Sequence, residues 1–281
     1  MNINRTPASL TTAITMLLAL PVLTLIGAPG HHLASPLRSP ITLEAAAYVT
    51  ATSSDSARAC RVPVAAQDGH ERNQPPLSYN QALRLIRTVT PGLVDITATL
   101  PSGAKAGTGI VLTANGRVLT ADHVVSHAIA LSVRDLGNGL DYAARIVGTD
   151  PFHDLAVLQL DGATQLHTVH LGGRVAIGEM VASIGNAGGR GQPSLGAGPV
   201  VALRQRITST TGQNQPLTGL IEACNGVEPG ESGGPLVTAD GLVVGLTVAT
   251  QLSDDGTPNG HGYAVPIATA MRAVRWILEN T

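Results

Sequence analysis

The segment Gly230–Pro235, with the sequence GESGGP, contains the serine whose surroundings best suit a nucleophile. The flanking glycines permit tight backbone turns and leave amide groups free to point at a ligand. Acyl transfer needs a hydroxyl nucleophile, a base that takes its proton, and donors that hold the oxyanion. We expect Ser232 to be the nucleophile and the backbone N–H groups of Gly230 and Ser232 to be the oxyanion donors. An incidental serine in a glycine-rich turn is the alternative interpretation.

Two further segments supply a base and a group that orients it. His123 comes shortly after the apolar run 117–120, so its imidazole is expected at the end of a strand. Asp154 immediately precedes the apolar run 155–160 and is expected to accept the Nδ1 hydrogen of His123. Each residue alone is more often structural, but together with Ser232 they predict a catalytic unit.

The elements that position these residues are predicted to be β-strands. Short runs rich in Val, Ile, Thr and Leu recur after Pro91, with turn residues between them, and no helical pattern separates them. This pattern favours antiparallel barrels or a sandwich and opposes a doubly wound sheet. Asn115–Gly116 is a two-residue hairpin signal. The runs are 93–100, 107–113, 117–120, 128–133, 143–147, 155–160, 180–184, 200–206, 217–221, 235–237, 242–249 and 262–265.

Helical patterns occur at both ends of this series. Ser78 and Gln81 have the spacing of a capping box, which predicts a short helix that ends at Pro91–Gly92. Apolar residues at helical spacing predict an amphipathic helix over 266–280. The glycine-rich stretch 185–199 lacks the Lys and Ser/Thr of a P-loop, so we expect a flexible surface loop there.

The composition excludes several classes of function. Of the 281 residues, 43% are hydrophobic, 2% are aromatic and 13% are charged, and the formal net charge is −2. Lys105 is the only lysine, which disfavours catalysis through a Schiff-base lysine and binding of nucleic acid along a basic stripe. His31–His32 and the His167-x-x-His170 pair lack a third ligand at metal spacing, so we expect neither a metal nor another cofactor.

The N-terminal residues predict export. Arg5 precedes an apolar run over 10–28 that contains several threonines and Pro21, and small residues follow it at Ala28–Gly30. Residues 1–30 are therefore expected to be a signal peptide or a membrane anchor, with the rest of the chain secreted or in the cell envelope. Residues 31–77, rich in Pro, Ser, Ala and Gln, predict a disordered linker before a folded domain at 78–281.

Export bears on the two cysteines, Cys60 and Cys224. An oxidising compartment and an even count permit a disulfide between them. The alternative, two unpaired thiols, stays open.

The motifs resemble those of bacterial trypsin-like serine proteases, and more closely their HtrA or Deg branch. The resemblance covers about residues 85–270 and implies two antiparallel six-stranded β-barrels, about 92–165 and 170–266, with the active site between them. It also implies that His123, Asp154 and Ser232 are base, orienting acid and nucleophile. The Ser segment is similar to that of streptogrisin-type enzymes as well. The segments that carry the resemblance are 107–111, 115–116, 120–124, 154–158 and 228–235.

The sequence also departs from this family. Only residues 266–281 follow Val265, so we expect no PDZ domain. Glu231 stands where the wider family has Asp or Asn, and the partner of this carboxylate is open.

The resemblance places the floor of the substrate P1 pocket at Gly226 and its far wall at Val244, Gly245 and Leu246. No carboxylate occupies this floor position, and burying an unpaired Arg or Lys is costly, so small or medium apolar P1 residues are expected. Glu228 is the one nearby acid that opposes this inference.

Two other functions remain to be distinguished. A catalytically silent barrel would bind proteins or peptides without cutting them. An α/β-hydrolase esterase would use Ser232 with Asp254 or Asp255 and His261, but the Gly-Gly-Pro sequence after Ser232 opposes the helix that such a nucleophile needs. An exported serine endopeptidase that acts on protein or peptide substrates is the expected function, and its oligomeric state is open.

Overall fold

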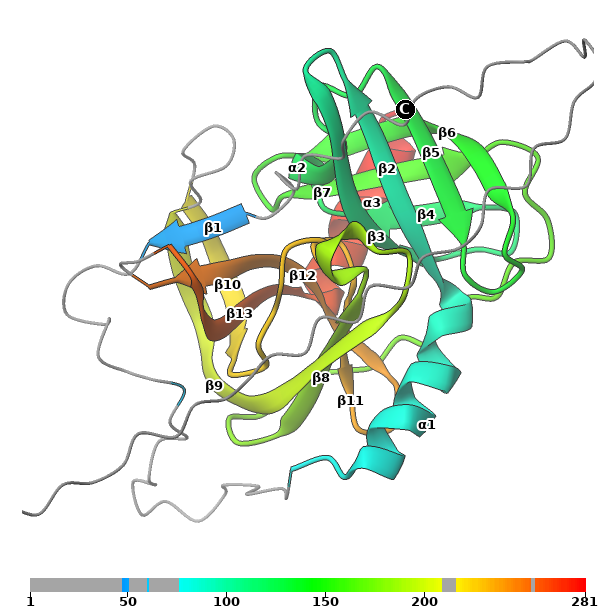
Figure 1. Ribbon diagram of the computed structural model, residues 1–281. Helices are drawn as coiled ribbons and strands as arrows, with labels where there is room; N and C mark the ends of the chain where they lie inside the picture. The colour runs from blue at the N-terminus through cyan, green and yellow to red at the C-terminus, as the bar shows by residue number, and fades with distance from the viewer. Residues whose placement is uncertain (1–46, 51–59, 61–75, 209–215, 254–255) are drawn as a thin grey trace, which may run out of the picture. The chain divides into compact units, whose positions relative to one another are not determined.

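The computed structural model describes residues 47–50, 60, 76–208, 216–253 and 256–281 (Figure 1). These residues belong to the unit formed by residues 39–281. The predicted export segment 1–30 lies outside them. Among the described residues, no helix is both long enough and apolar enough to cross a membrane.

The first half of the folded region is a closed six-stranded barrel in the order β2-β3-β4-β7-β6-β5. All neighbouring strands in it are antiparallel. Strand β5 alternates between exposed and buried residues, as expected for a strand with one face on the core. The strands are β2 (Leu93–Leu100), β3 (Gly103–Val111), β4 (Arg117–Thr120), β5 (Ala130–Asp135), β6 (Asp141–Asp150) and β7 (Leu155–Leu160).

The second half repeats the arrangement with six more antiparallel strands. Strand β8 pairs with β9, and the pairing continues through β10, β13, β12 and β11 back to β8. The predicted fold class, two six-stranded antiparallel β-barrels, is confirmed. The strands are β8 (Met180–Gly185), β9 (Ser194–Thr208), β10 (Pro216–Ala223), β11 (Pro235–Thr238), β12 (Val243–Leu252) and β13 (Pro258–Pro266).

A thirteenth strand joins the second sheet from a distant part of the sequence. Strand β1 (Ala47–Thr50) pairs in parallel with β12, with Ala47 opposite Ala249. These four residues lie within 31–77, where the sequence predicts only a linker.

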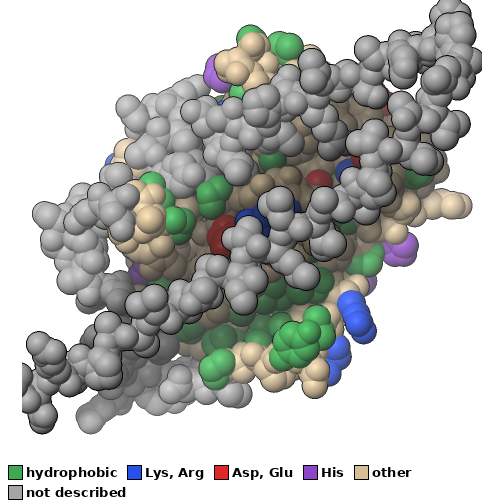
Figure 2. Space-filling model, in the orientation of Figure 1, with side chains coloured by type: hydrophobic (Ala, Val, Ile, Leu, Met, Phe, Trp, Pro, Cys, Tyr) green, Lys and Arg blue, Asp and Glu red, His purple; other side chains and the backbone are tan. Residues whose placement is uncertain are grey.

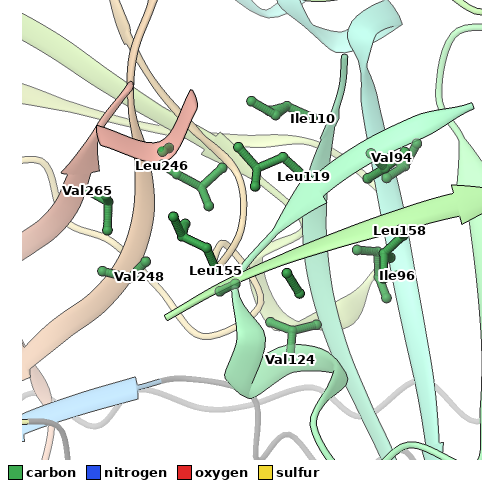
Figure 3. Packing of buried hydrophobic residues seen from close by; sticks show 14 of the residues in the cluster. Val94, Ile96, Ile110, Leu119, Val124, Leu155, Leu158, Leu246, Val248 and Val265 are labelled. Carbon is green, nitrogen blue, oxygen red and sulfur yellow. The ribbon is translucent and has the colours of Figure 1, made fainter. Parts of the chain in front are cut away.

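The two barrels share a hydrophobic core. Figure 3 shows Leu119 and Leu155 of the first barrel in one cluster with Leu246 and Val248 of the second. The C-terminal helix α3 (Ile267–Glu279) contacts β6 and β7 of one barrel and β12 and β13 of the other. The predicted C-terminal helix therefore holds the two halves together by burying its apolar face.

The N-terminal helix forms as the sequence predicts. Helix α1 (Tyr79–Val89) begins with a capping box in which Ser78 and Gln81 satisfy each other's backbone groups. It ends at the short 3-10 turn η1 (Thr90–Gly92), and Leu85 and Val89 are buried in the shared core.

Two local predictions are wrong. The stretch 185–199 is only partly a loop, because Ser194–Pro199 belongs to β9 and pairs with β8. Glycines fit there because a Cβ at Gly196 or Gly198 would collide with the carbonyl groups of Asn225 and Cys224. The β3–β4 hairpin turns over residues 112–116 instead of two residues, and within it only Gly116 has a positive φ.

The molecular surface carries few charges, as the composition predicts. On the face drawn in Figure 2, few Lys, Arg, Asp and Glu side chains are visible among the apolar and uncharged groups. No basic area spreads across the described residues on that face.

Candidate active site

His123 and Asp154 are held together by two hydrogen bonds. His123 Nδ1 lies 2.6 Å from Asp154 Oδ2, and the His123 backbone N–H donates to Asp154 Oδ1 at 2.9 Å. Because the second bond fixes the backbone of the short helix α2 (Asp122–Val125), the imidazole can rotate little. Both side chains are buried, at 8% and 9% exposure for the two residues. Asp154 therefore orients the ring and can stabilise its positive charge.

The backbone at Asp154 is held in an unfavourable conformation. Its φ is +55°, in the left-handed region that residues other than glycine rarely adopt. The Asp154 carbonyl accepts the N–H of Asp122, which closes the contact with α2. Such conformations concentrate at functional sites, where the surrounding structure enforces them.

Thr108 of β3 joins residues 230–235, here called the serine segment, to the first barrel. The N–H of Thr108 donates to the Ser232 carbonyl at 2.9 Å, and its hydroxyl donates to the Gly230 carbonyl at 2.8 Å. The same hydroxyl accepts the N–H of Asn186 from the second barrel. Thr120 completes the contact, because its hydroxyl donates to the Thr108 carbonyl. Two hydrogen bonds thus join the serine segment, and a third joins Asn186, to the barrel that carries His123.

The serine segment leaves the expected oxyanion donors free. Within the described residues, neither the N–H of Gly230 nor that of Ser232 donates to a protein group. Gly230 has a φ of +98°, and a Cβ there would collide with the Asn186 carbonyl, so glycine is required. His123 Nε2 is buried and has no hydrogen-bond partner in the described chain. Catalytic hydrogen bonds are often long before substrate binds, so this free nitrogen suits a base.

Two charged groups border His123. The single lysine, Lys105, donates from Nζ to the His123 carbonyl at 3.2 Å and so fastens α2 to β3. Burial, with a smaller effect from the neighbouring carboxylate of Asp154, raises the pKa of Asp122 to about 6. Asp122 therefore binds a proton more readily than an exposed aspartate does.

The partner of Glu231 is a hydroxyl. Ser194 Oγ lies 2.6 Å from Glu231 Oε1, and the Glu228 N–H donates to Oε2 at 3.2 Å. Glu231 is 2% exposed, and no cation contacts it among the described residues. Burial raises its pKa from 4.5 to about 7, although the bonds from Ser194 and Glu228 lower it. The carboxyl therefore binds a proton more readily in the folded protein.

The structure does not bring the predicted walls of the P1 pocket together. The Gly226 N–H donates to the Gly260 carbonyl, and residues on either side of Gly260 pair with Thr250 and Leu252 of β12. Val244–Leu246 lie toward the other end of that ladder and pack in the hydrophobic cores. The assignment of Val244, Gly245 and Leu246 to the pocket is therefore wrong. Cross-strand hydrogen bonds fix the register of β12, and the Gly233 N–H, next to Ser232, donates to the Thr247 carbonyl, which follows these three residues in β12.

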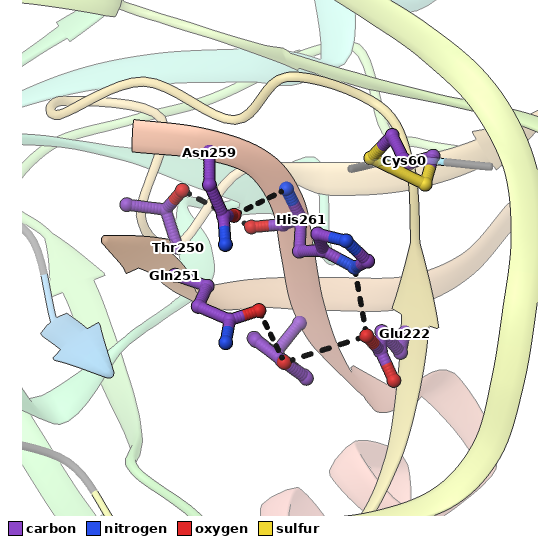
Figure 4. Close-up of a disulfide and its surroundings, with 8 residues drawn as sticks. Cys60, Glu222, Thr250, Gln251, Asn259 and His261 are labelled. Atoms are coloured by element: carbon purple, nitrogen blue, oxygen red, sulfur yellow. Dashed lines mark hydrogen bonds and ion pairs between the residues drawn. A yellow bond between two sulfur atoms is a disulfide. The ribbon is translucent and has the colours of Figure 1, made fainter. Parts of the chain in front are cut away.

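Cys60 and Cys224 form a disulfide, with Cα atoms 5.3 Å apart (Figure 4). Beside it, His261 Nδ1 lies 2.8 Å from Glu222 Oε1. The two sulfurs and a nitrogen of His261 lie within 4.8 Å of one another, but sulfurs in a disulfide offer no thiolate for a metal. The disulfide instead ties residue 60 to the strand that leads into the serine segment.

The esterase alternative is contradicted by the fold. Strand β11 begins at Pro235, three residues after Ser232, so no helix follows the serine. His261 pairs with Glu222, and Asp254 and Asp255 lie outside the described residues.

Sequence reasoning missed three residues of this site. Thr108 lies in a segment that carried the family resemblance, but nothing in the pattern marked its hydroxyl as a link between barrels. Ser194 and Lys105 gave no signal, because each acts only through a partner far away in the sequence.

We predict that Glu231→Gln removes a pH dependence of stability. The pKa of Glu231 is raised on folding, so the stabilising effect of its proton is complete below about pH 4.5 and is lost as the pH rises to about 7. Glu231→Gln should abolish a loss on the order of 3 kcal/mol in the free energy of unfolding between about pH 5 and about pH 8. Chemical denaturation measures this. Glu228→Gln, an exposed change of the same charge nearby, is the control, and an equal effect of both substitutions contradicts the prediction.

Comparisons with known proteins agree with this geometry. Residues 107–246 match the family described as trypsin-like peptidase domain. A probable periplasmic serine endoprotease, DegP-like, from Chlamydia muridarum is 33% identical over 183 residues, which cover 63% of this chain and 34% of that protein. The serine endoprotease DegS of Salmonella typhimurium is 29% identical over 230 residues, which cover 78% and 62%. The chain spans 45% or less of the length of the first relatives.

Solved structures give the same answer. The HtrA-type protease AlgW with tripeptide superimposes with a TM-score of 0.63 at 29% identity, covering 73% of this chain and 64% of that one. The matched segment 107–246 contains His123, Asp154 and Ser232. Through this segment the chain matches the trypsin-like peptidase domain, and it resembles the HtrA and Deg serine proteases.

Proposed function

We propose that this protein is an exported serine endopeptidase that cuts peptide bonds through an acyl-enzyme. The observation that carries the proposal is the paired contact of Asp154 with the ring and the backbone of His123, on the barrel to which Thr108 binds the serine segment. Ser232, His123 and the free N–H groups of residues 230 and 232 would supply the hydroxyl, the oriented imidazole and the oxyanion donors that this chemistry needs.

In this mechanism Ser232 Oγ attacks the carbonyl carbon of the scissile bond, and His123 Nε2 takes its proton. Asp154 accepts the Nδ1 hydrogen and stabilises the imidazolium. The N–H groups of Gly230 and Ser232 bind the oxyanion, and His123 then protonates the leaving amine. Water, deprotonated by the same nitrogen, releases the acyl group from Ser232.

Export is supported by three features: the N-terminal sequence, the names of similar proteins and the disulfide. The basic and apolar N-terminal residues have the order of a signal peptide or an anchor. Similar proteins are named periplasmic, and a disulfide suits an oxidising compartment. We therefore place the catalytic domain outside the cytoplasm.

We further propose that P1 is a small or medium apolar residue. Gly226 carries no side chain and has a φ of +63°, and its neighbour Asn225 is buried and uncharged. Glu228 is exposed, and its backbone groups bind Glu231. A substrate Arg or Lys would therefore enter the pocket without a paired carboxylate.

The catalytic roles predict large, non-additive losses of activity. Ser232→Ala, His123→Ala and Asp154→Asn should each lower kcat by about 10⁴-fold or more, and combining them should add little. The matched control is Asp150→Asn, because Asp150 binds His153 at 2.6 Å instead of His123. Steady-state cleavage of a peptide measures the effect. Full activity of Asp154→Asn with loss in Asp150→Asn contradicts the assignment.

A labelled active-site phosphonate separates the endopeptidase from a silent binding barrel. We expect it to modify Ser232 in the natural protein and to leave Ser232→Ala unlabelled. A folded natural protein that is not labelled and cuts no peptide would support the binding module instead.

Thr108 predicts an effect on catalysis from outside the triad. Thr108→Val keeps the side-chain shape but leaves the Gly230 carbonyl and the Asn186 N–H without partners, at about 1–3 kcal/mol for each buried group. Because Gly230 carries an oxyanion donor, kcat should fall by about tenfold or more, with a smaller change in KM. Thr108→Ser, which keeps the hydroxyl, should retain most activity. Equal activities of the two variants, each shown to be folded, contradict this role.

Cleavage of a peptide library tests the P1 preference. We expect cuts mainly after Val, Ala or Leu, with modest discrimination among them. Cleavage predominantly after Arg or Lys overturns the preference, and Glu228→Gln should then remove the basic specificity.

A further inference from the structure

The second barrel has a cavity that the proposed chemistry does not use. It has a volume of about 400 Å³, within the range of roughly 300–1,000 Å³ of small-molecule sites. It lies where β9 and β10 meet the beginning of α3. Five aliphatic side chains line it: Val175, Leu203, Leu220, Ile221 and Val244. Val244, which sequence reasoning assigned to the P1 pocket, therefore faces a different cavity.

Three arginines surround this apolar cavity. Arg174, Arg204 and Arg272 line it, and no Asp or Glu does. Within the described residues none of the three forms an ion pair, and Arg272 is steadied by a hydrogen bond from its Nη2 to Thr269 Oγ1 at 3.0 Å. Three unpaired cations beside an apolar surface make the cavity complementary to an anion that carries an apolar body.

Two β-bulges shape the cavity. Arg204 falls between the ladder pairs of Leu203 and Gln205, has no partner of its own, and has a φ of +56°. Gly219 is the unpaired residue on the facing strand, and a Cβ there would meet no atom within 4 Å. Bulges redirect side chains and left-handed residues are costly, so the fold maintains an unfavourable backbone that turns Arg204 to this cavity.

The beginning of α3 adds to the positive potential. The helix has 13 residues, no acidic residue in its first turn and no side-chain cap at Pro266. Ala268 and Thr269 of this turn line the cavity. The first N–H groups of a helix have no partner within it and attract negative charge.

We propose that this cavity binds a fatty acid of medium length, with the carboxylate at the arginines and the alkyl chain against the aliphatic side chains. The lining side chains favour this occupant over a peptide. Guanidinium groups only donate hydrogen bonds, and the only side-chain acceptor in the lining, Thr269 Oγ1, already accepts from Arg272, so the side chains offer the N–H groups of a peptide few partners. At roughly 30 Å³ for each water-sized group, the volume holds about thirteen non-hydrogen atoms, and decanoate has twelve.

Titration calorimetry with decanoate tests the proposal on the full chain carrying Ser232→Ala, which prevents self-cleavage. We expect one site, and affinity about fourfold higher for each methylene added between octanoate and decanoate. Arg204→Ala should weaken binding about tenfold. Arg206→Ala removes the same charge two residues along β9 but does not line the cavity, so it should bind like the parent.

A second variant guards against effects on folding. Ala268 is exposed at the cavity, so Ala268→Trp should block it and abolish binding while the unfolding transition stays unchanged. Equal affinity for decanol and decanoate, or equal losses in the two arginine variants, overturns the proposal. Tighter binding of a short peptide ending in leucine also overturns it, in favour of a peptide site. Because binding is measured without catalysis, these outcomes are independent of the endopeptidase proposal.

Discussion

The contact between Thr108 and the backbone of residues 230–232 is the constraint on which the rest of the site depends. A triad divided between two barrels works only if the barrels keep their register to within a fraction of a bond length. The Thr108 hydroxyl donates to the Gly230 carbonyl, and its N–H donates to the Ser232 carbonyl. The same hydroxyl accepts the N–H of Asn186. The residue is fully buried, so water does not compete for these bonds.

The site also contains elements that are unfavourable in isolation. The backbone of Asp154 is in the left-handed region, Gly230 has a positive φ, and the carboxyl group of Glu231 is almost completely buried. Such features persist only where surrounding structure over-determines them. Here the hydrophobic core extends through both barrels, and α3 packs on both, so relaxing any one of these residues would disturb packing shared by the whole domain.

Strand β9 connects the two sites on the second barrel. At its beginning Ser194 binds Glu231, next to the nucleophile, and toward its end the bulge at Arg204 opens the arginine-lined cavity. The disulfide is placed between these positions in the sheet, because Cys224 donates its N–H to Pro199 of the same strand. One long strand therefore binds Glu231, accepts a hydrogen bond from the disulfide cysteine Cys224 and forms one wall of the second cavity.

The sequence by itself predicted the fold class, most of the strands and both terminal helices, and it proposed His123, Asp154 and Ser232 as a catalytic triad. Alternating apolar runs, the Ser78 capping box and the order of His123, Asp154 and Ser232 are local signals, and each is legible over a few residues. The tertiary structure decided what depends on partners distant in the chain: the register that removes Val244–Leu246 from the P1 pocket, the pairing of Glu231 with Ser194, the roles of Thr108 and Lys105, and the addition of β1. A one-residue change of register exchanges the two faces of a strand, and the sequence pattern does not specify register across a bulge. Local chemistry thus proposed the catalytic residues, while long-range hydrogen bonds determined what surrounds them.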